Sequence, residues 1–443
     1  MKQILIIGAG RSSSSLISYL LEHSSAENWK VKVGDVTLEL AQQKVNKHAN
    51  GEAFVFDMND DANRVKEIEQ ADIVISMLPA HLHSKVAVDC VRLKKNLVTA
   101  SYVSKEINEL DGEAKKSGII LLNEIGLDPG IDHMSAMQII DKIKAKGDEV
   151  TLFKSYCGGL VAPEYNDNPW GYKFSWNPRN VVLAGQSTAK YIQNGEYKYI
   201  PYNRLFTQIE TVSVNDLGDF DAYANRDSLS YRKPYGLENI PTLLRGTLRM
   251  KGYCKAWNAF VKLGLTDDSY QIENSEKLTY KELIESFLPF GNLSTKEKLK
   301  VFLGTDANSE VIDKLSWLGI FEDVRIGIAN ATPAQILQHL LEQKWILKPH
   351  DKDMIVMQHQ FVAHNKSTNK SRKIISSLVV TGDDNIHTAM AKTVGLPMAI
   401  AARKILKGEI NLSGVQIPVM KEIYEPVLQE LQTLGIKFEE REE

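Results

Sequence analysis

The stretch ILIIGAGR, residues 4–11, decides the fold class of this chain. Its four apolar residues form a continuous run, which is typical of a strand buried on both faces of a parallel sheet. Gly8 and Gly10 follow the run and let backbone N–H groups approach a pyrophosphate at the start of a helix. The stretch therefore predicts the first turn of a dinucleotide-binding fold, with Gly8, Ala9, Gly10, Arg11 and Ser12 as cofactor contacts.

Position 13 departs from the usual fingerprint, because Ser13 stands where a third glycine is expected. We therefore expect the helix to pack less closely on its strand, or its first turn to differ. The apolar positions within residues 11–23 follow a helical stripe, and Ser12 or Ser13 is placed to cap that helix.

Strand and helix patterns alternate through the first 125 residues. Such alternation indicates a doubly wound parallel sheet with helices on both faces, the Rossmann type of α/β fold. After the first run, the expected strands are residues 31–33, 53–56, 73–75, 96–100 and 119–122.

Asp35 ends the second expected strand, at the spacing of the residue that reads the adenosine ribose. A carboxylate there accepts both ribose hydroxyls and repels a 2′-phosphate, which favours NAD. Arg11 has the opposite effect, because it lies in the phosphate loop and could hold a 2′-phosphate. NADP therefore stays possible. The alternative interpretation of Asp35 is a turn residue that caps the helix at residues 37–45.

The remaining chain does not continue this strand–helix alternation. Residues 157–180 are rich in glycine, proline and aromatic side chains and predict an ordered loop. Residues 254–265 predict a helix, and residues 277–343 are rich in helical patterns. Strands are expected at residues 149–156, 245–253, 354–362 and 374–380, the last two forming a hairpin across residues 366–371.

Composition sets limits on the function. The chain has 443 residues, 43% of them hydrophobic and 25% charged, with a formal net charge of −3. This balance argues against a nucleic-acid-binding surface, and no apolar run is long enough to span a membrane. Three widely spaced cysteines indicate reduced thiols in a cytoplasmic protein. His81 and His83 have no third metal ligand at a matching spacing, so we interpret them as surface or helix-start residues and expect no metal site.

Three stretches combine many side chains that are able to bind a substrate or take part in catalysis. Small, polar and charged side chains are interleaved in them with glycine and proline, away from helical patterns. They are ASYVS at residues 100–104 followed by NEIGLDPGIDH at 123–133, SYCGG at 155–159 followed by NPWGYKFSW at 168–176, and NRDS at 225–228 followed by RGTLR at 245–249.

These stretches resemble the saccharopine reductase family, the saccharopine dehydrogenases that form L-glutamate, and the resemblance runs from the glycine loop to Gly414. Val161, Ala224 and Trp170 depart from the family's usual Pro, Pro and Leu, which puts loop shape in doubt but removes no polar group. The resemblance implies a Rossmann domain at residues 1–128 and 388–443. It also implies a mixed α/β substrate domain at 129–265 and 346–387, and a helical subdomain at 266–345.

The resemblance also implies a reaction and a site. The family converts saccharopine and water to L-glutamate and 2-aminoadipate 6-semialdehyde, or the reverse, by hydride transfer to NAD(P) and imine hydrolysis. Matched residue by residue, the implied saccharopine contacts are Ser101, Tyr102, Asp128, Arg226, Thr247, Leu248 and Arg249. The implied cofactor contacts are the glycine loop, Asp35, Ser76, Leu78 and Leu127.

Physical chemistry supports the substrate residues independently. A tricarboxylate needs several guanidinium groups, because arginine binds carboxylates bidentately and stays charged. Arg226 and Arg249 are the favoured anchors, whereas Arg245 is more readily explained by a structural ion pair. Asp128, Tyr102 and Cys157 are the candidate proton-handling, catalytic residues, although Cys157 also suits a small packed position. The general base stays unassigned.

Two rival functions are left open by the sequence. One is a sister dehydrogenase acting on another imine-linked amino acid, such as carboxynorspermidine. The other is a non-catalytic dinucleotide-binding protein. A homodimer is a further expectation.

Overall fold

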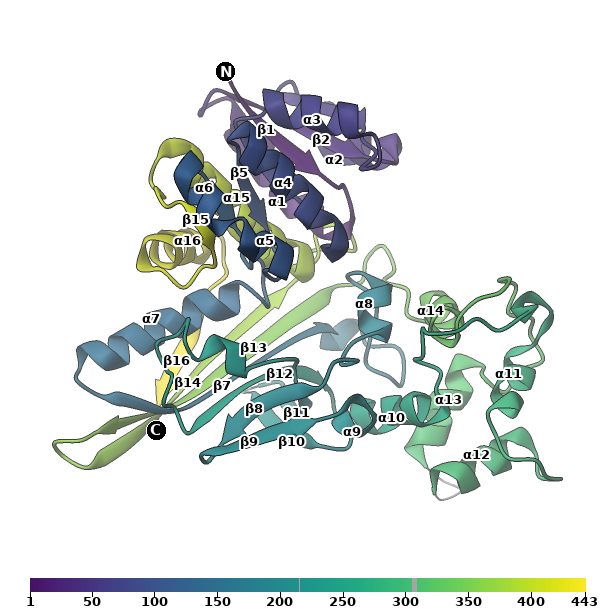
Figure 1. The fold of residues 1–443 in the computed structure, drawn as a ribbon. Coiled ribbons are helices and arrows are strands. Elements are labelled where there is room, and N and C mark those ends of the chain that lie inside the picture. The colour runs from purple at the N-terminus through teal and green to yellow at the C-terminus, as the bar shows by residue number, and fades with distance from the viewer. Residues whose placement is uncertain (215, 305–308) are drawn as a thin grey trace. The chain divides into compact units, whose positions relative to one another are not determined.

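The computed structural model describes residues 1–214, 216–304 and 309–443. The chain divides into two compact units (Figure 1). Unit 1 contains Met1–Val150 and Val362–Glu443, and unit 2 contains Thr151–Phe361. The division of the chain into three domains at the boundaries given above stays a prediction.

Unit 1 is built on a seven-stranded sheet in the order β15-β6-β5-β4-β1-β2-β3. Every neighbouring pair in this sheet is parallel. Strands β1 to β6 follow the order 3-2-1-4-5-6 that defines the doubly wound dinucleotide-binding sheet, so the predicted fold class is confirmed. The strands are β1 (Lys2–Ile7), β2 (Trp29–Asp35), β3 (Gly51–Val55), β4 (Ile73–Ser76), β5 (Asn96–Thr99), β6 (Ile120–Leu122) and β15 (Gly414–Gln416).

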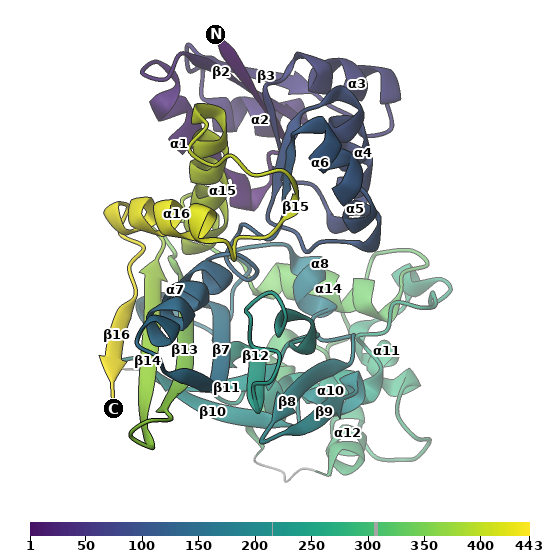
Figure 2. The same ribbon diagram turned by 60° about the vertical axis from the view of Figure 1, so that its left-hand side comes forward.

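Helices cover both faces of this sheet (Figure 2). One face packs on α3 (Asp61–Gln70), α4 (His83–Leu93), α5 (Lys105–Glu109) and α6 (Asp111–Ser117), because the apolar side chains of these helices share one core with alternate strand residues. The other face carries α1 (Ser14–Ser24), α2 (Leu38–Val45) and α15 (Ala389–Lys407), and unit 1 also contains α7 (Ile131–Ala145) and α16 (Lys421–Thr433).

The late helix α15 lies close against α1 at Gly395. A Cβ added there would lie 2.9 Å from the backbone nitrogen of Leu16 and 3.3 Å from the carbonyl oxygen of Ser12. Only glycine permits this approach, so the C-terminal segment is fitted tightly onto the helix that follows the glycine loop.

The first turn after the glycine loop differs from an α-helix, which agrees with one of the two expectations raised by Ser13. Arg11–Ser13 is a 3-10 turn, and α1 begins only at Ser14. The prediction that Ser12 or Ser13 caps the helix through its side chain is wrong: neither N-terminus has a side-chain cap, and the Ser13 hydroxyl donates to the carbonyl oxygen of Gly10 at 2.8 Å. The Ser13 hydroxyl thus bonds within its own turn and makes no bond to the N–H groups of the helix.

Unit 2 contains most of a mixed sheet in the order β10-β11-β12-β7-β13, whose residues 149–150 in β7 and 362–365 in β13 belong to unit 1. Strands β10, β11 and β12 are antiparallel neighbours, whereas β12 and β7 run parallel, and β8 pairs with β12 and β9. The strands are β7 (Glu149–Val161), β8 (Ala189–Gln193), β9 (Glu196–Ile200), β10 (Ile209–Val214), β11 (Gly218–Ala224), β12 (Thr242–Met250) and β13 (Asp353–Asn365).

Strand β13 is followed after a short turn by β14 (Lys370–Thr381), which lies in unit 1 and pairs antiparallel with β16 (Glu439–Glu442). The turn coincides with the position predicted for it, and Asn365 closes it by accepting a hydrogen bond from the N–H of Thr368 at 2.9 Å.

The helices of unit 2 lie between β7 and β8, between β9 and β10, and between β12 and β13 along the chain. They are α8 (Pro178–Val182), α9 (Tyr202–Leu205), α10 (Tyr253–Leu263), α11 (Tyr280–Ser286), α12 (Thr295–Leu303), α13 (Glu310–Leu318) and α14 (Pro333–Lys344). Trp170 anchors their core, with its ring stacked on Phe260 at 5.5 Å between centroids and its indole N–H donating to the carbonyl oxygen of Lys314. Within the described part of the chain, no helix is long and apolar enough to cross a membrane.

Candidate functional site: a dinucleotide loop and a tyrosine-caged arginine

The glycine loop of unit 1 has the geometry that a pyrophosphate requires. Gly8 has a φ of +106°, which a side chain would strain, and its N–H donates to the carbonyl oxygen of Gly34 at 2.8 Å. No heavy atom lies within 4 Å of a Cβ built on Gly10, so the loop is open there. Backbone N–H groups beside an open glycine, at the start of a helical segment, fit a dinucleotide phosphate.

Asp35 is bonded to the same loop. Its Oδ2 accepts a hydrogen bond from the Ala9 N–H at 2.7 Å, and its Oδ1 accepts one from the Thr37 N–H at 2.9 Å. The second bond is an Asx turn rather than a helix cap, since α2 begins at Leu38 and has Thr37 in the cap position. The capping alternative for Asp35 is therefore not what the structure shows, and its role toward the ribose stays a prediction.

A buried pair of titratable side chains holds the Asp128 loop in place. His133 Nε2 lies 3.0 Å from Glu124 Oε2, and Glu124 Oε1 accepts a hydrogen bond from the Val103 N–H at 3.1 Å. The Glu124 N–H donates in turn to the carbonyl oxygen of Ser101 at 3.0 Å. These contacts join the predicted substrate segment at residues 101–103 to the segment that carries Asp128.

The loop itself requires glycine at its turn. A Cβ on Gly130 would lie 2.1 Å from the carbonyl oxygen of Gly126, and the Gly130 φ is +146°. The Gly130 N–H donates to Asp132 at 2.7 Å, and the Asp128–Pro129 peptide bond is cis. The turn leaves Asp128 half-buried while Leu127 beside it is buried. Unit 1 thus brings Ser101, Tyr102 and Asp128 onto segments that are bonded to each other.

In unit 2, the parallel strands β7 and β12 bring Cys157 and Thr247 into register. Arg245 and Arg249 lie on the same face of β12 as Thr247, because successive side chains alternate between faces. Leu248 therefore faces the opposite side and is fully buried in the core. Of the predicted substrate residues on β12, Leu248 offers a substrate on the Thr247 face only its backbone.

Arg249 lies in a cage of tyrosine rings. Its guanidinium carbon is 5.4 Å from the ring centre of Tyr172, 5.8 Å from that of Tyr223 and 5.5 Å from that of Tyr253. Burial raises the pKa of all three tyrosines, so the phenols stay neutral and attract the cation only through their rings.

The charge of Arg249 is left without a carboxylate partner. The side chain is 4% exposed, its Nη1 donates to the carbonyl oxygen of Leu248 at 2.9 Å, and its Nε has no hydrogen-bond partner. Within residues 1–214, 216–304 and 309–443, no carboxylate oxygen lies within ion-pair distance of it. A buried, unpaired guanidinium is costly unless it binds an anion.

The reason for the missing partner is visible on the neighbouring strand. Asp221 of β11 stands directly opposite Arg249 in the antiparallel register. Its carboxylate points to the start of α10 instead, where Oδ2 accepts from the N–H groups of Gly252 at 3.0 Å and Cys254 at 3.2 Å. The acidic residue opposite Arg249 is thus committed to a helix N-terminus, where its charge is stabilised by the helix dipole.

The other two arginines differ from Arg249. Arg226 is exposed and has a left-handed backbone with a φ of 47°, in a loop fixed by a hydrogen bond from the Lys190 N–H to the Arg226 carbonyl oxygen at 2.8 Å. Arg245 is buried with its guanidinium 4.5 Å from the ring centre of Tyr231. Arg245 lies on the same face of β12 as Thr247, and the structural role that the sequence favoured for it stays a prediction.

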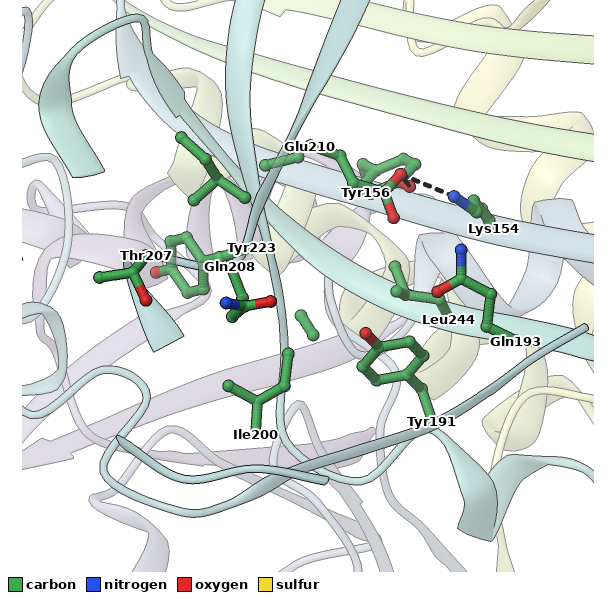
Figure 3. Close-up of a pocket in the computed structure, with 13 residues that line it drawn as sticks. Lys154, Tyr156, Tyr191, Gln193, Ile200, Thr207, Gln208, Glu210, Tyr223 and Leu244 are labelled. Atoms are coloured by element: carbon green, nitrogen blue, oxygen red, sulfur yellow. Dashed lines mark hydrogen bonds and ion pairs between the residues drawn. The ribbon is translucent and has the colours of Figure 1, made fainter. Parts of the chain in front are cut away.

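A cavity of about 400 Å³ lies over the opposite face of this sheet (Figure 3). Glu210 sits between two of its lining residues: Lys154 lies 2.6 Å from Glu210 Oε2, and the Tyr156 hydroxyl donates to the same oxygen at 2.9 Å. Burial, reinforced by Glu210, raises the pKa of Tyr156. Lys154 and Tyr156 are on the other face of β7 from Cys157. The lining of the cavity includes none of the predicted substrate residues, but it does include Tyr223 of the Arg249 cage.

Sequence reasoning missed two buried histidines of unit 1. His83 starts α4 as expected, but it is buried between Ser76 and Ser101 rather than on the surface. A histidine at the first helical residue after a strand that ends in serine was the available signal. His133 lies nine positions after Glu124, across a turn rich in glycine and proline, which was the signal for that pair. No group of three potential metal ligands occurs among the described residues.

Two family models of known proteins match nearly all of the chain. Residues 4–122 match the family model described as "Saccharopine dehydrogenase NADP binding domain", and residues 126–436 match "Saccharopine dehydrogenase C-terminal domain". The chain belongs to the saccharopine dehydrogenase family. The first of these matches confirms a dinucleotide-binding, NAD(P)-type Rossmann domain, but the choice between NAD and NADP stays a prediction.

Family members of two lengths are similar to this chain. It is 39% identical to the mitochondrial alpha-aminoadipic semialdehyde synthase of Rattus norvegicus over 99% of this chain and 47% of that protein, so it spans about half the length of such relatives. It is 34% identical to the saccharopine dehydrogenase [NADP(+), L-glutamate-forming] of Pyricularia oryzae over 99% of each chain. An apo saccharopine dehydrogenase (L-Glu forming) structure from Saccharomyces cerevisiae matches with a TM-score of 0.89 at 33% identity, over 100% of both chains.

Proposed function

We propose that this protein is an NAD(P)-dependent saccharopine dehydrogenase of the L-glutamate-forming kind. It oxidises the carbon beside the bridging nitrogen of saccharopine, and water then splits the resulting imine into L-glutamate and 2-aminoadipate 6-semialdehyde. The observation that carries the proposal is Arg249, a buried guanidinium with tyrosine neighbours and no carboxylate partner in the described part of the chain. A tricarboxylate substrate supplies the anion that this position lacks.

The residues of unit 2 act mainly by holding carboxylates. Arg249 accepts one carboxylate in its tyrosine cage, and Thr247 and Cys157 lie beside it on the same sheet face. Arg226, which is exposed on its loop, is the proposed anchor for a second carboxylate. Such binding fixes the reacting carbon, and positioning is the main demand of a hydride transfer.

The residues of unit 1 supply the cofactor loop and the polar groups around the reacting nitrogen. When bound, a nicotinamide dinucleotide supplies the hydride acceptor; the open loop at Gly10 and the carboxylate of Asp35 are the proposed contacts for its phosphates and ribose. Asp128 and Tyr102, on segments bonded through Glu124, are the proposed groups that take the proton from the substrate nitrogen and orient water.

The deciding experiment is an assay of the purified protein with saccharopine and each of NAD and NADP, in which the reduced nicotinamide and L-glutamate are both measured. We expect equal amounts of the two products. Carboxynorspermidine serves as the comparison substrate, since it has fewer carboxylates for the arginines to bind. Turnover of carboxynorspermidine without turnover of saccharopine would show the sister activity instead.

Two finer expectations belong to this proposal. The protein works in the cytoplasm, and it forms a homodimer. Fractionation of the source cells and sedimentation of the purified protein test them.

A further inference from the structure

The imidazole ring of His83 lies between two serine hydroxyls of unit 1. Its Nδ1 is 2.8 Å from the Ser76 Oγ, and its Nε2 is 2.7 Å from the Ser101 Oγ. His83 is 2% exposed, and Ser76 is 1% exposed. The two serines are therefore joined by one buried side chain.

The fold explains why these three residues meet. Ser76 is the last residue of β4, and it pairs in register with Thr99, the last residue of β5. His83 is the first residue of α4, the helix that follows β4. Since the two strands end side by side at the carboxyl edge of a parallel sheet, the first residue of this helix lies over both ends. Thr99 completes the cluster, because its hydroxyl accepts the Ser101 N–H at 3.3 Å.

The protonation state of the ring limits how the two serines can bond. Burial, with a smaller contribution from His81, lowers the pKa of His83 to about 4, so the ring is neutral at neutral pH. A neutral imidazole has one N–H donor and one acceptor nitrogen. The ring also has a backbone hydrogen-bond partner at Leu78, and the Thr99 Oγ1 lies 3.5 Å from each ring nitrogen. Where both serines keep the shorter contacts, one serine donates to the ring and the other accepts from it.

We propose that His83 is a positioning residue that fixes the hydroxyls of Ser101 and Ser76 in a single hydrogen-bond chain, so that the substrate-side and cofactor-side serines are oriented together. This inference rests on the proposed function, which assigns Ser101 to saccharopine and Ser76 to the dinucleotide. It adds a residue that neither assignment includes.

The donor–acceptor direction of this hydrogen-bond chain couples Ser101 at one end to Ser76 at the other. A substrate carboxylate offers only acceptors, so Ser101 donates its hydrogen to it and accepts from His83 Nε2–H. The Nδ1 atom is then the acceptor, and Ser76 must donate to it. The Ser76 oxygen is left with its lone pairs, which suits a donor group of the dinucleotide. Binding of a substrate carboxylate at Ser101 thus favours the Ser76 orientation in which the hydroxyl donates to His83 and accepts from the dinucleotide. This couples substrate binding to cofactor binding.

Two substitutions separate the ends of the chain. An asparagine at position 83 places its amide near the position of Nδ1, and a glutamine places it near that of Nε2. We expect His83→Asn to keep the Ser76 contact and lose the Ser101 contact, which raises the KM of saccharopine about 10-fold and leaves the Kd of the reduced dinucleotide within twofold. His83→Gln should raise that Kd about 10-fold and leave the KM within twofold. The exposed His81→Asn is the matched control and should change neither.

The experiment measures the Kd by fluorescence of the reduced nicotinamide, the KM and kcat with saccharopine, and the urea midpoint of each variant. Equal effects of both variants on KM and Kd, or no effect of either, would overturn the proposal. So would a fall in the urea midpoint with normal kinetics per folded molecule.

If the His83 variants fail to fold, Ser76→Ala provides the second measurement. Ser76→Ala removes the hydroxyl that donates to Nδ1, so the ring can carry its proton on Nδ1 and accept from Ser101 at Nε2. Unlike the amide of His83→Gln, the ring then takes the Ser101 hydrogen away from the substrate, and we expect the KM of saccharopine to rise about threefold or more. An unchanged KM would contradict it. The Kd of the reduced dinucleotide is measured without substrate, so it tests His83 even if the wild-type protein does not oxidise saccharopine. Absence of saccharopine oxidation would contradict the proposed function but not the role of His83 toward Ser76.

Discussion

The carboxylate of Asp35, at the end of β2, accepts a hydrogen bond from the backbone N–H of Ala9 in the glycine loop at 2.7 Å. The residue predicted to read the ribose therefore also holds the loop that is predicted to bind the pyrophosphate. Any substitution of Asp35 should act on loop stability as well as on cofactor choice.

We expect the wild-type enzyme to prefer NAD over NADP by about 5- to 150-fold in kcat/KM, because a 2′-phosphate brings negative charge next to Asp35. Asp35→Ser should narrow this preference and lower the free energy of unfolding by about 1 kcal/mol, since the Ala9 N–H loses its charged acceptor. Arg11→Ala should widen the preference if Arg11 offsets the repulsion. Faster turnover with NADP at equal low concentration would reverse the prediction and align this chain with its fungal relatives, which are named for NADP.

Arg249→Met should separate substrate binding from stability. Loss of the guanidinium should weaken saccharopine binding by about 2–5 kcal/mol, because a carboxylate is left without its partner. The apo protein should be as stable as wild type or more stable, since methionine fills the tyrosine cage without an unpaired buried charge. Calorimetric titration and urea unfolding measure the two effects. A lower stability with an unchanged KM would assign Arg249 to structure instead.

Asp128→Asn should lower kcat/KM strongly and change the free energy of unfolding by less than about 1 kcal/mol, because the half-buried side chain is nearly isosteric. Glu124→Gln is the contrasting variant. Glu124 is buried against His133 and the Val103 N–H, so its substitution should destabilise the fold by about 1–3 kcal/mol. If Asp128→Asn were the destabilising variant and Glu124→Gln the neutral one, the roles would be exchanged.

His83 should make unit 1 sensitive to acid. Its pKa in the folded state is lowered to about 4 from an ordinary value near 6.5. Between these values His83 is protonated in the unfolded chain but not in the folded chain. The free energy of unfolding therefore falls as the pH falls through this window. The expected loss between pH 7.5 and pH 5 is about 2 kcal/mol. Urea midpoints at the two pH values should show a smaller loss in His83→Gln than in wild type, and equal losses would rule out this contribution.

The sequence predicted the sheet of unit 1 well, because strands buried on both faces carry continuous apolar runs that are visible without a structure. It did not reveal β15, since Gly414–Gln416 is only three residues long and has no periodic pattern. The resemblance alone placed the C-terminal segment near the Rossmann sheet.

The geometry of the glycine loop was predictable where it depends on local sequence, as at Gly8 and Asp35, and the roles of these residues toward a cofactor stay predictions. The unpaired state of Arg249 was not, because it depends on Asp221, which stands opposite Arg249 but bonds to the start of α10. The burial of His83 was not predictable either. It follows from two strands ending side by side, and sequence spacing does not show which strands are neighbours.

The pairing of β15 with β6 has a consequence for the newly made chain. Residues 120–122 leave the ribosome on the order of tens of seconds before residues 414–416, at ordinary rates of synthesis. During that interval β6 is an unpaired edge, the kind of strand that joins to foreign chains and aggregates. The residues of unit 2 are all synthesised in the same interval. The Rossmann sheet is therefore started before unit 2 is made and completed after it, so chaperones that bind exposed strand edges have access to β6 throughout that interval.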